Sequence, residues 1–199
     1  FGVPYVVRSD QDILADSDIK KFIVLLRAIH NFGVAEYLIS ALHIDFLKIE
    51  PLDIYKLIEY SNRSHVHIAH ILENPKLLES GLLKDRVAIT KFFNNLKKWS
   101  VLSRNKNFID FFEEITRESG FLAHLLSHNN PIEKMEKLEG LFSEVKTLVG
   151  RQKVSMADFL EYLDVVSEHK VLLKKSASLD LAKRVKLMTA HKAKGLEFE

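Results

Sequence analysis

Apolar residues recur every three to four positions along most of the chain, which is the spacing of helices with one buried face. The longest runs predict helices over residues 17–31, 34–42, 85–102, 107–119 and 131–149. Shorter runs predict helices from Pro51 and over residues 65–72, and the sequence from Ser155 to Asp158 has the form of a capping box that opens another. The pattern therefore predicts a mainly α protein.

Cap and turn residues set the expected ends of these helices. We expect the acidic residues around Asp16 to cap the first helix, Gly120 to interrupt the chain, and Gly150 to end the helix that Pro131 begins. In the helix from Pro51 the expected buried residues are Leu52, Tyr55, Leu57 and Ile58, and in the helix over residues 85–102 they are Val87, Phe92, Phe93, Leu96 and Trp99.

Both ends of the chain depart from the helical pattern. Residues 3–7 form a short β-rich run, and Val185, Leu187 and Thr189 alternate with their neighbours as in a strand. The second run then becomes polar and contains Gly195, where a backbone can approach a ligand closely. A strand followed by a polar, glycine-containing turn is how α/β proteins present ligand-binding loops.

Composition adds little to this picture. The chain has 199 residues, 47% of them apolar, a formal net charge of +2 and a pI of about 8.6, so charge alone does not indicate a nucleic-acid partner. No run of eighteen apolar residues or signal segment indicates a membrane or export, and we expect a cytoplasmic protein. The absence of cysteine excludes disulfides and thiolate metal sites.

Four local features could carry chemistry. The histidines at 65, 67 and 70 do not share one helix face, so no metal site is predicted from them. The Glu113–Glu114 pair is interpreted as a solvated helix face. An aromatic stripe could stack on bases but is assigned to the core: Phe108, Phe111, Phe112. A basic cluster could contact DNA but is assigned to a solvated helix end: Lys97, Lys98, Arg104, Lys106.

The chain carries two longer motifs, one at each end. Residues 185–198 read V-K-L-M-T-A-H-K-A-K-G-L-E-F, which resembles motif V of the UvrD/Rep/PcrA-type superfamily 1 DNA helicases at every fixed position. Residues 2–7, G-V-P-Y-V-V, and residues 18–27, D-I-K-K-F-I-V-L-L-R, resemble the family segments G-I-P-Y-x-V and E-I-K-D-x-x-x-Y-L-R. The motifs occur in the family's order, with about 150 residues between them.

This resemblance implies a domain organisation. Residues 1–33 would belong to the second RecA-like lobe (2A), residues 34–182 to the helical accessory subdomain (2B), and residues 183–199 to the motif V strand and loop of the same lobe. The expected fold is mainly α, an insertion of about eight helices with short strands at both termini that belong to an incomplete RecA-like α/β lobe.

The resemblance also implies roles for the motif residues. Thr189 and His191 would contact single-stranded DNA, Gly195 and Glu197 would lie against the nucleotide, and Lys194 would serve either anion or couple the two sites. The parent protein would use ATP and Mg, and would bind single-stranded DNA, a duplex junction and an accessory protein partner. No P-loop, Walker B box or arginine finger occurs in the sequence, so no catalytic residue or resident cofactor is predicted for this chain.

One departure from the family and two alternatives remain open. Residues 40–47 contain no glycine where many relatives carry an R-G-I-G-like turn that touches duplex phosphates, so no residue is named for duplex contact. The preferred interpretation is a DNA helicase of repair or replication. The alternatives are a non-catalytic helical interaction module and a recombination-type helicase-nuclease, which would need a nuclease domain further along the chain.

Overall fold

The computed structural model describes residues 5–7, 12–74, 76, 81–151, 153–173 and 185–187. Strands lie at the two ends of this set and helices fill the rest, which confirms the predicted mainly α fold. The elements are β1 (Tyr5–Val7), η1 (Ile13–Ala15), α1 (Ser17–His30), α2 (Ala35–Leu42), η2 (Asp45–Leu47), α3 (Pro51–Ser64), α4 (Ile68–Glu73), α5 (Arg86–Asn105), α6 (Phe108–Glu118), α7 (Phe121–Leu126), α8 (Pro131–Arg151), α9 (Met156–Glu168) and β2 (Val185–Leu187). None of the described helices is long and apolar enough to cross a membrane.

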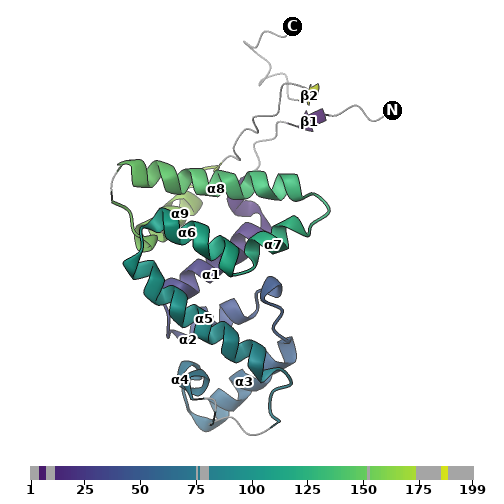
Figure 1. Ribbon diagram of the computed structural model, residues 1–199, viewed down its shortest axis with the longest axis vertical. Coiled ribbons are helices and arrows are strands. Elements are labelled where there is room, and N and C mark those ends of the chain that lie inside the picture. The colour runs from purple at the N-terminus through teal and green to yellow at the C-terminus, as the bar shows by residue number, and fades with distance from the viewer. Residues whose placement is uncertain are drawn as a thin grey trace.

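The helices form an elongated body in which α8 lies across one end (Figure 1). α1, α6, α7 and α9 gather beneath α8, and α5 runs from this group toward α3 and α4 at the other end. α1 packs against α2, α5 and α9, so it occupies the middle of the body although it is the first α-helix of the chain. The predicted division at residue 33 stays a prediction.

The core is built around Phe22 of α1. Its ring stacks on Phe121 with 4.4 Å between centroids and meets the edge of Phe112 at 5.4 Å. Phe108 and Phe111 are buried beside Phe112, which confirms that these phenylalanines are core residues rather than a surface for stacking bases. Offset and edge-on contacts of this kind add to the gain from burying each ring.

Side-chain caps begin several helices where the sequence predicted them. The Asp16 carboxylate accepts hydrogen bonds from the backbone N–H groups of Asp18 and Ile19 at the start of α1. Ser155 and Asp158 form the expected capping box of α9. Caps of this kind satisfy N–H groups that have no partner within the helix, and so fix where it starts.

Three expectations about buried helix positions are wrong. Leu52 and Tyr55 are 54% and 64% exposed, and Val87 is 77% exposed. The buried residues of α3 are Asp53, Ile54 and Leu57. The Asp53 carboxylate accepts hydrogen bonds from the backbone N–H groups of Lys84 (2.8 Å) and Asp85 (2.7 Å). A buried carboxylate is tolerated there because these donors replace water.

The predicted end of α8 is also wrong. Gly150 lies inside the helix, which continues to Arg151. Glycine adopts helical dihedrals as readily as left-handed ones, so its presence near a helix end does not force the helix to stop. Gly120, in contrast, has φ +82° and separates α6 from α7, as predicted.

The chain enters and leaves the helical body at neighbouring points. The backbone N–H of Ile13 donates to the carbonyl of Leu173 at 2.9 Å. β1 and β2 also pair with each other in parallel, with Tyr5 opposite Val185 and Val7 opposite Leu187. Parallel strands need a long crossover connection, and here that connection contains the whole helical body.

Candidate functional site

The motif at the C-terminal end begins in β2. The described part of the motif is Val185–Leu187, which pairs with β1. The predicted DNA-contacting residues Thr189 and His191 lie outside the described residues, as do the remaining predicted site residues, Lys194, Gly195 and Glu197. Their roles therefore stay predictions.

The strand pairing fixes the direction of β2, the strand in which the motif begins. Because β1 and β2 are parallel, their carboxyl ends meet at the same edge of the sheet. Open α/β sheets bind ligands beyond the carboxyl ends of their strands. Leu187, the last residue of β2, lies at this edge, and the remaining motif residues follow it in the sequence.

The basic cluster considered for DNA contact is largely neutralised by acidic neighbours. Lys97 Nζ lies 3.3 Å from a carboxylate oxygen of Glu73, and Lys98 Nζ lies 2.9 Å from one of Glu118. Lys106 forms an ion pair with Glu114. These pairs favour the interpretation as a solvated helix end.

A second polar site, which the sequence did not reveal, surrounds the start of α1. Lys134 Nζ lies 3.0 Å from Asp16 Oδ2 and 2.6 Å from Asp18 Oδ2, and Lys137 Nζ lies 2.8 Å from Asp16 Oδ2. Burial raises the pKa of the Asp16 carboxyl, but hydrogen bonds from Lys137 and Lys134 more than offset this and leave the pKa well below its ordinary value. The site joins α8 to α1.

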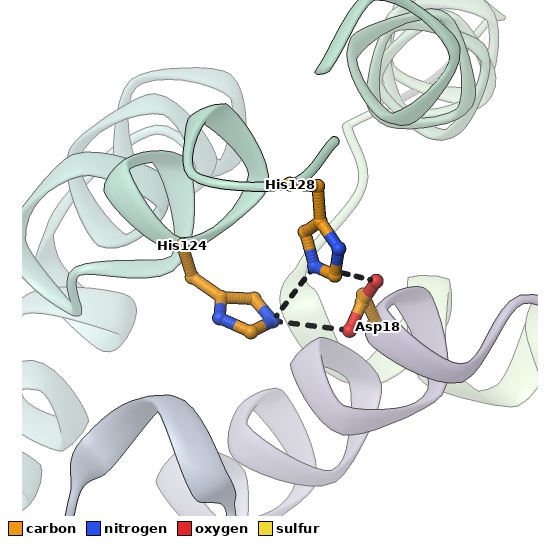
Figure 2. A group of neighbouring side chains, drawn as sticks. All are labelled: Asp18, His124 and His128. Atoms are coloured by element: carbon orange, nitrogen blue, oxygen red, sulfur yellow. Dashed lines mark hydrogen bonds and ion pairs between the residues drawn. The ribbon is translucent and has the colours of Figure 1, made fainter. Parts of the chain in front are cut away.

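Burial likewise raises the pKa of the Asp18 carboxyl, and hydrogen bonds from Lys134 and His124 outweigh that effect, so its pKa is also lowered. Asp18 is 1% exposed and lies between two histidines, His124 of α7 and His128 of the turn that follows it (Figure 2). His124 Nε2 is 3.1 Å from Asp18 Oδ1, and His128 Nε2 is 3.3 Å from Asp18 Oδ2.

The histidines singled out in the sequence have other positions. His67 caps α4, because its Nδ1 accepts a hydrogen bond from the backbone N–H of Ala69 at 3.3 Å, and His65 ends α3 in a left-handed conformation. The four-residue spacing of His124 and His128 was the local signal that could have identified the other pair. Asp18 could not be linked to them by sequence, since it lies 106 residues from His124.

An apolar groove of about 620 Å³ lies between α6, α7 and α8. Its lining includes Leu122, Met135 and Phe142, and the exposed side chains of Leu126 (55%) and Ile132 (59%). Acidic residues on α6 and α8 also border it: Glu113, Glu136, Glu139. The groove has the size and apolar lining of binding sites in other proteins.

Comparisons with known proteins cover the whole chain. Residues 1–199 match the family model described as UvrD-like helicase C-terminal domain. The chain is 23% identical over 202 residues to an ATP-dependent helicase/nuclease subunit of Pediococcus pentosaceus, in a match that covers 100% of this chain and 16% of the relative. It is 21% identical over 202 residues to the protein of the same name from Latilactobacillus sakei subsp. sakei (100% of this chain, 23% of the relative).

A further relative is the ATP-dependent DNA helicase Rep of Buchnera aphidicola, with 22% identity over 203 residues, 99% of this chain and 31% of the relative. The chain thus spans less than a third of the length of each of these relatives. The full-length match to the family model and the order of the two terminal motifs agree with each other. The chain belongs to the UvrD-like helicase C-terminal domain family.

Proposed function

We propose that this chain is the helical accessory subdomain of an ATP-dependent DNA helicase, together with two flanking pieces of the second RecA-like lobe. The observation that carries the proposal is the parallel pairing of β1 with β2 around a helical body whose first and last residues, Ile13 and Leu173, are hydrogen-bonded. An insertion between two adjacent strands of one sheet must have its entry and exit side by side. The family match supports the same arrangement.

In this proposal the motif after β2 joins the DNA site to the nucleotide site. Thr189 and His191 contact phosphate or sugar of single-stranded DNA, which positions the strand without reading its sequence. Glu197 accepts a hydrogen bond from the nucleotide ribose beside Gly195, and Lys194 lies between the two anions. A loop that touches both ligands gives each an influence on the binding of the other.

The rest of the machinery lies in other parts of the parent protein. ATP and Mg would be bound mainly by a P-loop and an acidic box, which this sequence does not contain, so this chain by itself is proposed to have no ATP hydrolase activity. The parent protein would couple hydrolysis to translocation on the single strand and to unwinding at a duplex junction, in DNA repair or replication in the cytoplasm.

A helicase-nuclease is a variant of this proposal. Two of the relatives described above carry the name of a helicase/nuclease, and the chain covers 16% and 23% of their lengths. A parent protein of this kind would add a nuclease domain to the motor. An assay of the full-length gene product with Mg on linear duplex DNA distinguishes a helicase from a helicase-nuclease, because only the second would degrade the DNA.

A non-catalytic interaction module is the second candidate, and the groove between α6, α7 and α8 favours it. An amphipathic helix of an accessory protein would place its apolar face against Met135 and Phe142, and basic residues at its edges would meet Glu113 and Glu139. A helicase can also carry such a partner site, so the groove alone does not separate the two candidates.

Hydrolysis of ATP by the full-length gene product, measured with and without single-stranded DNA, tests the proposal. We expect strong stimulation by the strand. Thr189→Ala and His191→Ala should raise the DNA concentration needed for half-maximal stimulation, whereas Glu197→Ala should raise the KM for ATP. A gene product without hydrolysis in either condition would reject the motor and favour the interaction module.

A further inference from the structure

Asp18, His124 and His128 converge on one small space from two segments that are distant in sequence (Figure 2). His124 Nε2 lies 3.1 Å from Asp18 Oδ1 and 3.3 Å from His128 Nε2, and His128 Nε2 lies 3.3 Å from Asp18 Oδ2. The two imidazole rings are nearly perpendicular, at 82°. One oxygen or nitrogen atom from each residue lies within 4.8 Å of those of the other two.

Hydrogen bonds among these groups cannot account for all three short contacts. An ionised carboxylate only accepts, and a neutral imidazole carries one N–H on either of its nitrogens. The two Nε2 atoms can therefore supply at most two protons for three contacts. If both protons point at Asp18, the two Nε2 atoms lie 3.3 Å apart with no proton between them. A cation at the centre would satisfy all three groups at once.

The second carboxylate oxygen of Asp18 already contacts a positive charge. Asp18 is 1% exposed, and Lys134 Nζ lies 2.6 Å from its Oδ2. A buried carboxylate requires such a partner, because it has lost its contacts with water. A metal ion bound by Asp18 would have to take the place of this ammonium group.

We propose that Asp18, His124 and His128 form a binding site for a divalent transition-metal ion, for which Zn²⁺ fits best. Two imidazole nitrogens and one carboxylate are a known ligand set for zinc, with water in the fourth position. Tetrahedral ligands about 2.0–2.1 Å from zinc lie about 3.3 Å from one another. The two Nε2 atoms are 3.3 Å apart, and His124 Nε2 lies 3.1 Å from Asp18 Oδ1. The His128 side chain is 35% exposed, so the ion and the water can reach the site from solvent.

The bound ion would fasten the start of α1 to α7 and to the turn before α8. Lys134 is the natural competitor, because its ammonium group neutralises the same oxygen of Asp18. Lys134 Nζ also lies 3.0 Å from Asp16 Oδ2, so it keeps an anionic partner when the metal takes Asp18. Removal of the Lys134 charge should therefore tighten metal binding, which an adventitious surface site elsewhere would not show.

The test is a titration of the whole chain with Zn²⁺ by calorimetry and with Co²⁺ by visible absorption. We expect one ion for each chain and Co²⁺ bands of a four-coordinate site. His124→Ala and His128→Ala should weaken binding by about tenfold or more, and Lys134→Met should strengthen it. The matched controls are His43→Ala and His70→Ala, exposed histidines on other elements, which should leave the affinity unchanged.

The fold of each variant is checked by circular dichroism before titration. His128→Gln keeps a polar side chain of similar length, and it should lose the metal as His128→Ala does if the imidazole is a ligand. Equal Zn²⁺ affinity in the unchanged chain, in His124→Ala and in His128→Ala would overturn the proposal. An equal loss in the His43→Ala or His70→Ala control would overturn it as well, since binding would then be spread over surface histidines.

Discussion

The helical body and the terminal strand pair differ in what holds them together. The body encloses one continuous apolar core centred on Phe22, Phe112 and Phe121. The described part of the strand pair consists of three residue pairings between β1 and β2. The body contains the family segment of residues 18–27 in α1, but it contributes none of motif V, whose residues are predicted to contact DNA and nucleotide. Stability and proposed chemistry therefore lie in separate parts of the chain, and substitutions should separate them.

The largest effect is expected in the core. Phe22→Ala removes a ring that packs on Phe112 and Phe121 and leaves a cavity, so we expect a loss of about 3–5 kcal/mol in the free energy of unfolding. Urea denaturation measures it. The control is Thr189→Ala at the other end of the chain, which should leave the denaturation midpoint unchanged. Similar losses of stability in Phe22→Ala and Thr189→Ala would contradict the claim that the body alone provides the stability.

The next effect concerns the buried carboxylate of α3. Asp53→Ala leaves the backbone N–H groups of Lys84 and Asp85 without acceptors at the start of α5, and we expect a loss of about 1–3 kcal/mol in the free energy of unfolding. Leu52→Ala, next to it but 54% exposed, should change the same quantity little. A larger loss of stability from Leu52→Ala than from Asp53→Ala would contradict this account, and it would indicate that Leu52 is buried, as periodicity predicted.

Two glycines should respond to alanine with opposite signs. Gly120→Ala places a side chain at φ +82° and should destabilise the body by about 1–2 kcal/mol. Gly150→Ala, inside α8 with no atom within 4 Å of the added Cβ, should stabilise it by about 0.5–1 kcal/mol. Thermal unfolding of both variants checks this, and a stabilising Gly120→Ala would contradict the left-handed turn.

The smallest effect is a local titration in the body. Hydrogen bonds from Lys98 and Trp99 lower the pKa of the Glu118 carboxyl below its ordinary value. Because the folded pKa lies below the unfolded one, this stabilisation is present above the unfolded pKa and is lost as pH falls through the folded pKa. Trp99 is the single tryptophan, so its fluorescence should change with a midpoint below the ordinary pKa of a glutamate. Lys98→Met should move the midpoint upward, and a midpoint above the ordinary glutamate pKa in the unchanged chain would contradict the contact.

Local sequence pattern was sufficient for most of the helical body. The helix starts at Asp16 and Ser155 were predictable because a cap depends on residues within a single turn. The exposure of Leu52 and Tyr55 was not predictable. Asp53 is buried because it accepts a hydrogen bond from the backbone of Lys84, which lies 31 residues away, just before α5. Periodicity counts apolar residues and does not recognise a polar residue that is buried by long-range hydrogen bonds.

The candidate sites divide in the same way. The motif residues from Thr189 to Glu197 could be named from the sequence because they are contiguous, and their roles stay predictions that rest on resemblance. The cluster of Asp18, His124 and His128 could not be named in this way, since only the spacing of the two histidines is local. The contact with Asp18 depends on how α1 packs beside α7, which no local pattern contains.

The most direct test of the central claim removes most of the helical body from the full-length gene product. Residues 34–182, the predicted accessory subdomain, would be replaced by a flexible Gly-Ser linker, so that α1, which carries the family segment assigned to the motor lobe, is retained. If the body is an insertion in a motor lobe, the shortened protein keeps hydrolysis of ATP that single-stranded DNA stimulates. A shortened protein that folds, binds ATP and shows no stimulation by DNA would contradict the separation of chemistry from the body.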